Sequence, residues 1–333
     1  HGIYAVDAVE QAISQAGLTK DQLADESTGL FAASSGSFFL LRHHLSAYEE
    51  NQWTRGHPLG VGRSVAGTLN FNLAARYGIR GSNCGFVSAC ASSSHALAYA
   101  YDEIVLGRQD RMLVVGAEEC FVENVLPFDA MRALSASDDP DAACRPFDHA
   151  RDGFVVSGGA VAIVLEAASV AQKSPLAQML GWGQASDGYH VASPHPEGAG
   201  LAAAMKRALR SADVAPDAVE YVNAHATSTP AGDRAEALAL RSIFAASENK
   251  PAIVSTKGLT GHGLSLSGVM EAALTVLSID QGFLPGNRNL VQPDKACDGL
   301  HLPTQSINGD INMALNNSSG FGGANVCHVF SSP

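Results

Sequence analysis

The stretch Phe86-Val87-Ser88-Ala89-Cys90-Ala91-Ser92-Ser93-Ser94-His95 decides how the chain is read. Its first two residues predict the end of a short buried strand, and apolar side chains at helical spacing follow over 96–107. Cys90 therefore falls in a sharp turn near a helix N-terminus, where the partial positive charge of the helix favours thiolate. The Cys90 N–H can also serve a developing oxyanion. The stretch leaves open a nucleophile or a buried, inert cysteine.

Composition excludes several classes of protein. The chain has 333 residues, 46% of them hydrophobic and 16% charged, which is typical of a compact protein with a large core. No apolar run approaches the roughly 20 residues of a membrane span. A formal net charge of −12 argues against nucleic acid as a partner. The six cysteines have neither CxxC nor zinc-finger spacing, which predicts no metal site and favours a reducing cytoplasm.

Hydrophobic spacing predicts an α/β chain. A helix over 65–77, the strand before Cys90, the helix after it and a strand over 112–116 form a strand–helix–strand unit, so we expect a parallel sheet. Three other segments carry less regular patterns. We expect an irregular surface excursion at 38–58, an irregular connection at 121–146 and two strands around a glycine turn at 153–164.

A short internal repeat indicates two related halves. The first copy is Gly153-Phe154 with Gly158-Gly159-Ala160, and the second is Gly320-Phe321-Gly322-Gly323-Ala324. Each half also has a strand, a loop with a candidate functional group and then a helix. We therefore expect an N-terminal half, 1–175, that carries the cysteine, and a C-terminal half, 176–333. The site is expected where their loops meet.

His225 follows a strand-like segment at 219–224, at the end of the strand where parallel sheets bind ligands. Thr227 and Thr229 come directly after it and can hydrogen-bond a polar substrate arm. The alternative is a histidine that caps the next helix.

Lys257-Gly258-Leu259-Thr260-Gly261-His262-Gly263 forms a second candidate loop, on a backbone that permits close approach. The alternative is a solvated glycine loop. Glu236 falls on the inner side of a helix over 233–244. If it is buried it needs a cation, and Lys257 is the natural partner; otherwise it is a surface glutamate.

Gly320-Phe321-Gly322-Gly323 forms a third candidate loop. It permits close approach of a substrate to the backbone, and the alternative is a plain hairpin turn.

Together and in this order, these motifs resemble those of the β-ketoacyl-[acyl carrier protein] synthases, the decarboxylating condensing enzymes of fatty acid and polyketide synthesis. The elongating type I and type II enzymes are the most similar. The resemblance covers nearly the whole chain and rests on Ser88–Ser92, Phe128–Ser135, Arg145–Phe154, Asn223–Asp233 with Glu236, Ser255–His262 and Asn317–Asn325.

The resemblance implies a thiolase-like fold: five αβαβα layers in two pseudo-symmetric halves, usually dimeric. Cys90 matches the cysteine that is acylated. His225 and His262 match the pair that promotes decarboxylation of a malonyl thioester, because neutral imidazoles can donate N–H groups to the enolate oxygen without quenching the carbanion. The N–H groups of Cys90 and Phe321 match the oxyanion hole, and Phe321 also matches a gating phenylalanine.

Four further residues take supporting roles by the same resemblance. Lys257 matches the lysine that orients the site, with Glu236 as its expected partner. Thr227 and Thr229 match threonines that contact the phosphopantetheine arm.

Three departures from the family pattern stand out. The strand and helix that usually precede the segment matching His1 are absent, so we expect the first sheet to lack a strand. Ala226 replaces the usual glycine, a small change. Ser319 stands where relatives usually carry phenylalanine. We expect this serine to open or polarise a substrate-binding wall near Cys90, which leaves room for a polyene or other polyketide chain.

The expected activity is decarboxylative Claisen condensation of an acyl group on Cys90 with malonyl-acyl carrier protein, giving 3-oxoacyl-acyl carrier protein and CO2. A cysteine thioester is a good acyl donor for this step. No metal or organic cofactor is implied, because phosphopantetheine arrives on the carrier protein. The alternatives are a non-catalytic, chain-length-determining partner subunit and a cysteine hydrolase.

The expected partners are an acyl carrier protein and either an identical or a related ketosynthase-like subunit in a dimer. Carrier proteins are acidic, so a basic patch is required despite the net charge of −12. Arg55, Arg63 and Arg207 are the candidates.

Overall fold

The computed structural model describes residues 1–333 and contains two main sheets. The first has the strand order β2-β1-β3-β4, formed by β1 (Thr28–Ala33), β2 (Asn83–Phe86), β3 (Arg111–Glu118) and β4 (Gly159–Glu166). β2 and β3 flank β1 in parallel, whereas β4 runs antiparallel to β3. Every residue of β1 and β3 is buried, because helices cover both faces of this sheet.

The second sheet has the order β5-β11-β10-β6-β7. Its strands are β5 (Gln178–Ser186), β6 (Tyr221–Asn223), β7 (Ala252–Val254), β10 (Met313–Gly320) and β11 (Ala324–Ser331). β7 and β10 flank β6 in parallel and β11 runs antiparallel to β10, so β7-β6-β10-β11 repeats the arrangement β2-β1-β3-β4. β5 has no counterpart in the first sheet, which therefore has one strand fewer, as expected.

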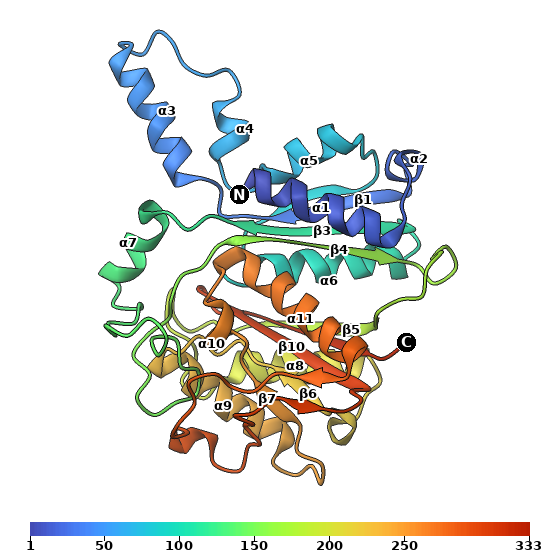
Figure 1. Ribbon diagram of the computed structural model, residues 1–333, viewed down its shortest axis with the longest axis vertical. Coiled ribbons are helices and arrows are strands. Elements are labelled where there is room, and N and C mark those ends of the chain that lie inside the picture. Colours follow the sequence, from blue (N-terminus) through green and yellow to red (C-terminus); the bar gives the residue numbers. More distant parts are fainter.

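Helices separate and cover the two sheets, giving the predicted five αβαβα layers (Figure 1). Between the sheets lie α6 (Ser92–Val105) and α11 (Ser267–Gln281). The outer face of the first sheet is covered by α1 (Gly2–Ala16) and α5 (Leu69–Tyr77). The outer face of the second sheet is covered by α8 (Ala199–Ser211) and α9 (Pro230–Phe244).

The middle layer is apolar on both sides because it contacts both sheets. Small and apolar residues such as Ala96, Ala100, Val269 and Ala272 are fully buried there, in one hydrophobic cluster. The outer helix α1 instead buries only Ala5 and Val9 and ends at Gly17 in the left-handed conformation (φ 73°). The sandwiched middle layer fixes the start of α6 and of α11 relative to both sheets.

Several local predictions were wrong. Residues 38–50 form the helix α3 (Phe38–Glu50), although it buries no residue and projects from the body as expected for a surface excursion (Figure 1). The connection at 121–146 contains the helix α7 (Val122–Ala130). The segment 153–164 contributes one strand, β4, while Phe154 and Val156 form only isolated bridges to other loops. β2 is an edge strand with exposed residues rather than a buried one.

The remaining elements are short. They are α2 (Lys20–Leu23), α4 (Gly60–Ser64), α10 (Lys257–Thr260), the two-stranded pair β8 (Phe283–Leu284) and β9 (Ile307–Asn308), and three single 3₁₀ turns at 216–218, 264–266 and 295–297. None of the helices combines the length and apolar character that a membrane crossing requires.

Candidate active site

Cys90 occupies a strained turn between β2 and α6. The preceding residue, Ala89, has a left-handed backbone (φ 51°), which costs a non-glycine residue about 1–2 kcal/mol. The Ser92 hydroxyl braces the turn, accepting from the Ser88 N–H at 2.8 Å and donating to the Ala89 carbonyl at 2.6 Å. Cys90 itself is 7% exposed. The turn thus holds the thiol in a fixed, buried position.

The β10–β11 turn packs directly on the Cys90 turn. A Cβ atom on Gly320 would lie 2.8 Å from the Ser88 carbonyl oxygen and 3.2 Å from the Cys90 nitrogen, so only glycine fits there. This approach brings Phe321 to the cysteine. The backbone N–H groups of Phe321 and Cys90 both lie close enough to the Cys90 sulfur to lower the pKa of its thiol. The two predicted oxyanion-hole donors therefore converge on the reacting atom.

Two histidines of the second half reach the same point. Nε2 of His262 lies 3.1 Å from Sγ of Cys90. The rings of His225 and His262 lie 5.4 Å apart, centroid to centroid, and are nearly perpendicular at 83°. All three side chains are buried. The structure thus brings together a thiol from one half and two imidazoles from the other.

The His262 ring is held from three directions. Its Nδ1 lies 2.9 Å from the Ser267 hydroxyl, its backbone N–H donates to the Val155 carbonyl at 2.7 Å, and the Phe154 ring packs edge-on at 5.2 Å. Sequence reasoning did not identify Ser267. A serine at the start of a helix, five residues after a candidate histidine, was the available signal.

Burial sets the protonation states of the site. It raises the pKa of the Cys90 thiol to about 12, against the opposing effect of the nearby Lys257 charge. It lowers the pKa of both His225 and His262 well below their usual value, and Lys257 lowers both further. The resting site therefore holds a thiol and two neutral imidazoles. The expectation of a favoured thiolate was wrong, because loss of water raises the pKa of the thiol more than Lys257 and the backbone N–H groups lower it.

The expected partner of Lys257 was also wrong. Lys257 is completely buried and forms an ion pair with Glu271 of α11, which is equally buried. Glu236 instead accepts hydrogen bonds from the N–H groups of His225, at 3.0 Å, and of the residue after it, and from Asn317 at 3.2 Å. α9 lies beneath the His225 loop, whereas α11 reaches Lys257 from the middle layer. Glu271 could have been found as an acid within the first turns of a largely apolar helix.

The two threonines after His225 lie side by side, with their hydroxyl oxygens 3.1 Å apart. Thr229 also caps α9, accepting from the Gly232 N–H at 3.2 Å. Thr227 is buried and lines a cavity together with His225. The histidine-cap alternative for His225 does not apply, since Thr229 supplies the cap.

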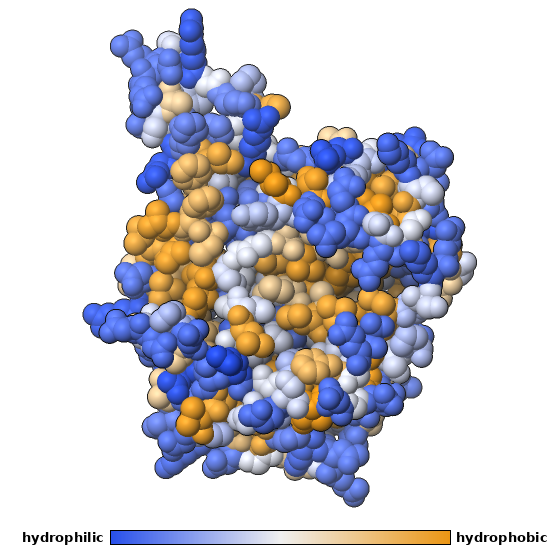
Figure 2. Space-filling view, viewed as in Figure 1, coloured by the Kyte–Doolittle hydropathy of each residue, from blue (hydrophilic) through white to orange (hydrophobic).

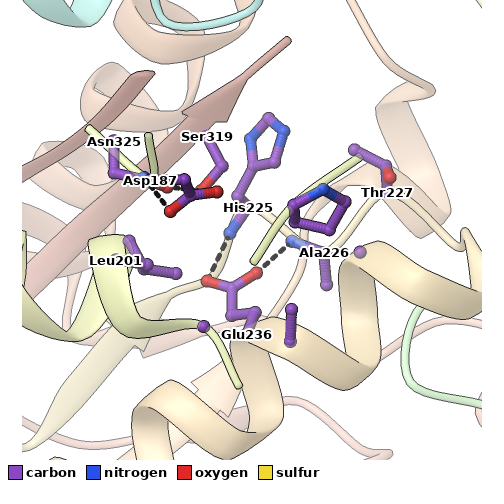
Figure 3. A pocket seen from close by; sticks show the side chains of 12 residues that line it. Asp187, Leu201, His225, Ala226, Thr227, Glu236, Ser319 and Asn325 are labelled. Carbon is purple, nitrogen blue, oxygen red and sulfur yellow. Dashed lines mark hydrogen bonds between the residues drawn. The ribbon is translucent and has the colours of Figure 1, made fainter. Parts of the chain in front are cut away.

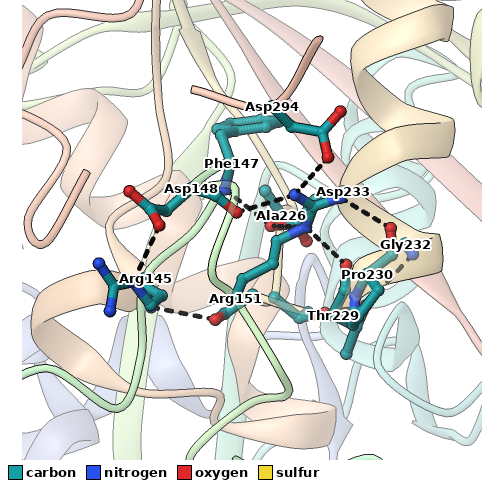
Figure 4. A network of polar contacts seen from close by, with 12 residues as sticks. Arg145, Phe147, Asp148, Arg151, Ala226, Thr229, Pro230, Gly232, Asp233 and Asp294 are labelled. Carbon is teal, nitrogen blue, oxygen red and sulfur yellow. Dashed lines mark hydrogen bonds and ion pairs between the residues drawn. The ribbon is translucent and has the colours of Figure 1, made fainter. Parts of the chain in front are cut away.

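A buried arginine network holds the threonine loop in place (Figure 4). The Arg151 guanidinium pairs with Asp233 at 3.6 Å and Asp294 at 2.9 Å. It also donates to the carbonyl oxygens of Thr229, at 3.2 Å, and Pro230, at 2.8 Å. This network ties the loop after β6 to the 145–151 segment of the first half.

Ser319 lies beside His225 (Figure 3). It does not line the cavity that opens from Cys90, which corrects its expected place. Its hydroxyl donates to Asn325 Oδ1 at 2.7 Å, and the Asn325 amide donates to Asp187 at 2.9 Å. These residues line a polar cavity of about 40 Å³. The serine therefore polarises the wall on the histidine side of the site.

A larger cavity of about 220 Å³ opens from Cys90 between the start of α3, α7 and the 264–265 turn. Its wall is mostly apolar and includes Phe128, Leu264 and Phe321. Such a space suits a hydrocarbon chain attached to the cysteine.

The three candidate arginines do not form one patch. Arg63 lies on α4 and bonds to His57 at 3.1 Å, and Arg55 lies in the same excursion. Arg207 lies on α8, in the opposite half of the molecule (Figure 1), and donates to the Gln184 carbonyl.

A cysteine at a strand–helix turn, two neutral imidazoles and paired N–H donors, placed between the halves of a five-layered fold, define a thiolase-like condensing enzyme. Residues 3–171 match the protein family described as "Beta-ketoacyl synthase, N-terminal domain". Residues 176–291 match the family described as "Beta-ketoacyl synthase, C-terminal domain". The chain belongs to the beta-ketoacyl synthase family, the condensing enzymes of fatty acid and polyketide synthesis.

Individual relatives agree with this assignment. 3-Oxoacyl-[acyl-carrier-protein] synthase 1 of Haemophilus influenzae is 37% identical over 98% of this chain and 81% of its own length. A beta-ketoacyl synthase from Burkholderia phymatum superimposes with a TM-score of 0.93 at 34% identity, covering 100% of this chain and 82% of that one. A ketosynthase solved with its type II polyketide acyl carrier protein and bound to a hexaketide gives 0.92 at 27% identity, covering 99% and 84%.

Proposed function

We propose that this chain transfers an acyl group from an acyl carrier protein to Cys90 and condenses it with malonyl-acyl carrier protein, releasing CO2 and 3-oxoacyl-acyl carrier protein. The observation that carries the proposal is the 3.1 Å contact between Cys90 Sγ and His262 Nε2, with His225 and two backbone N–H donors around the same point.

In the first step, Cys90 attacks the carbonyl carbon of the acyl thioester. The thiol proton passes to His262 Nε2 and from there to the departing carrier thiolate. The thioester bond to the carrier breaks as the thioester bond to Cys90 forms, and no net charge remains on the site. The N–H groups of Cys90 and Phe321 receive the oxyanion of the tetrahedral intermediate. Phe321, whose ring borders the cavity, acts as the gate.

In the second step, malonyl thioester loses CO2 and its electron pair moves into the enolate. His225 and His262 each donate an N–H to the thioester oxygen, and as neutral rings they leave the carbanion unprotonated. The carbanion then attacks the acyl carbon on Cys90, and the thiolate leaves and is reprotonated. The Ser267 hydroxyl suits both steps, because a hydroxyl can accept from Nδ1–H or donate to a bare Nδ1.

The remaining site residues support these two steps. Burial lowers the pKa of both imidazoles, and the Lys257 charge, held by its ion pair with Glu271, lowers both further. Glu236 holds the backbone of the His225 loop. Thr227 and Ser319, which line the cavity beside His225, and Thr229 contact the polar pantetheine arm.

The proposed setting follows from the chemistry. Phosphopantetheine arrives on the carrier protein, and the chain's own thiol, imidazoles and N–H groups perform each step without a resident metal or organic cofactor. Six free cysteines fit a reducing cytoplasm. The halves 1–175 and 176–333 each supply part of the site.

A dimer with an identical or related subunit is the proposed assembly. Apolar side chains gather over α7 and the base of α3 (Figure 2), where the exposed rings of Phe39 and Phe121 stack at 5.2 Å. A patch of this kind is typical of a protein interface.

Trapping tests the proposal and separates the alternatives. The protein is incubated with acyl-loaded carrier, and intact mass and CO2 release are measured with and without malonyl carrier. An acyl adduct on Cys90 together with CO2 release is expected, and Cys90→Ala should abolish both while the surface control Cys84→Ala retains them. No adduct would indicate a non-catalytic partner subunit. Free fatty acid without CO2 would indicate a hydrolase.

A further inference from the structure

The cavity that opens from Cys90 carries several polar side chains in its mostly apolar wall, and all but one already have partners. Ser35 and Ser265 donate to the buried Glu118, and Ser34 accepts from the Gly36 N–H. Ser92 braces the Cys90 turn, and Glu123 pairs with Arg42 at 2.6 Å. The exception is Asn124.

Asn124 is only 3% exposed, yet neither its amide oxygen nor its amide nitrogen has a hydrogen-bond partner. Both atoms are inaccessible to water, so solvent does not supply the missing partners. Buried amides are nearly always paired, because burial without a partner is costly. Asn124 sits in the first turn of α7, where its backbone N–H already donates to Phe121. Its unpaired side chain therefore calls for a functional explanation.

We propose that Asn124 recognises an oxygen on the acyl chain, so that this enzyme takes acyl groups bearing a hydroxyl or carbonyl away from the thioester. This inference rests on the proposed function of Cys90. A planar amide among apolar residues such as Phe128 and Leu264 is the usual means by which an apolar pocket orients a ligand. Neither amide atom is accessible from the cavity, so recognition requires the amide to turn toward the entering chain. Rotation about the Cβ–Cγ bond of asparagine is soft and permits this turn without backbone movement.

The amide chemistry sets an order of preference. A hydroxyl can both donate to Oδ1 and accept from Nδ2, whereas a carbonyl can only accept from Nδ2. A methylene satisfies neither atom. A site built to bond an oxygen discriminates against the analogue that lacks it, because its own polar group is left unpaired. The expected order is therefore hydroxyl, then carbonyl, then unsubstituted chain.

The experiment compares acylation rates of Cys90 from carrier protein loaded with a straight acyl chain and with its hydroxy and oxo counterparts, the oxygen moved along successive carbons. The wild type should favour an oxygenated chain at one position by about tenfold in kcat/KM, the usual worth of a buried hydrogen bond. Asn124→Leu, similar in size but without polar atoms, should remove that preference. Asn72→Leu, an exposed asparagine on α5, is the matched control and should keep it.

Two results would overturn the inference: a wild type that treats oxygenated and plain chains alike, or an Asn124→Leu variant that retains the preference. Melting temperature and oligomeric state establish that each variant is folded. If no chain acylates Cys90, the proposed function fails. Binding of the same loaded carriers to Cys90→Ala protein then tests chain recognition separately, with the same preference expected and equal affinities counting against it.

Discussion

Nε2 of His262 lies 3.1 Å from Sγ of Cys90, although 172 positions separate the two residues. Each comes from a different sheet and half, and the middle helices α6 and α11 hold them together because both helices contact both sheets. Small changes in this middle layer should therefore act on chemistry rather than only on stability.

Removal of the Ser267 hydroxyl should impair decarboxylation more than acyl transfer. In Ser267→Ala, Nδ1 of His262 loses its hydrogen-bond donor, so the tautomer that presents Nε2–H to the thioester oxygen is less populated. We expect about a tenfold loss of malonyl decarboxylation, the worth of one buried hydrogen bond. Ser267→Thr, which keeps a hydroxyl, should restore it. Separate assays of CO2 release and Cys90 acylation, with the buried Ser278→Ala on the same helix as control, decide the matter; equal losses in both assays would refute the tautomer role.

The Lys257–Glu271 pair should be costly to break singly. Both side chains are fully buried, so Lys257→Met or Glu271→Leu alone leaves an uncompensated charge and should lower the free energy of unfolding by about 3–5 kcal/mol. The double variant should recover part of this loss. Urea unfolding of all four proteins gives the comparison, and a double variant as unstable as the sum of the singles would contradict the pairing.

Asp233 should make the protein less stable as pH rises. Burial raises the pKa of its carboxyl to about 7, although Arg151 opposes the shift, whereas the ordinary value is 3.8. The fold therefore favours the protonated form, and this contribution is complete below the unfolded pKa and lost as pH rises through about 7. Asp233→Asn should flatten the fall in unfolding free energy that occurs as pH rises from the ordinary pKa of 3.8 to about 7. Parallel wild-type and variant profiles would exclude the effect.

Asn124→Leu should stabilise the protein while it removes the preference for oxygenated acyl chains. The unpaired amide costs about 1–2 kcal/mol, which the apolar side chain avoids. Thermal unfolding in the absence of carrier protein measures this directly. A lower melting temperature in Asn124→Leu would mean that the amide already has a stabilising partner in the folded protein.

Local patterns were sufficient for features that depend on near neighbours in the chain. Small residues around Cys90 predicted the strand–helix turn, and the glycine repeat predicted the two related halves. Periodicity failed for α3, because its apolar residues cluster at its start and none is buried against the core, so no core-facing stripe runs along the helix.

The sequence by itself determined the α/β class and the order in which the thiol and imidazoles occur, because these follow from residue type and spacing. The five-layered fold was implied by the family that its motifs resemble. Only the tertiary structure decided that Lys257 pairs with Glu271, that Ser319 faces His225 and that Cys90 rests as a thiol. Those outcomes depend on which helix reaches a group across the middle layer and on how completely water is removed from it. Neither is encoded in local spacing.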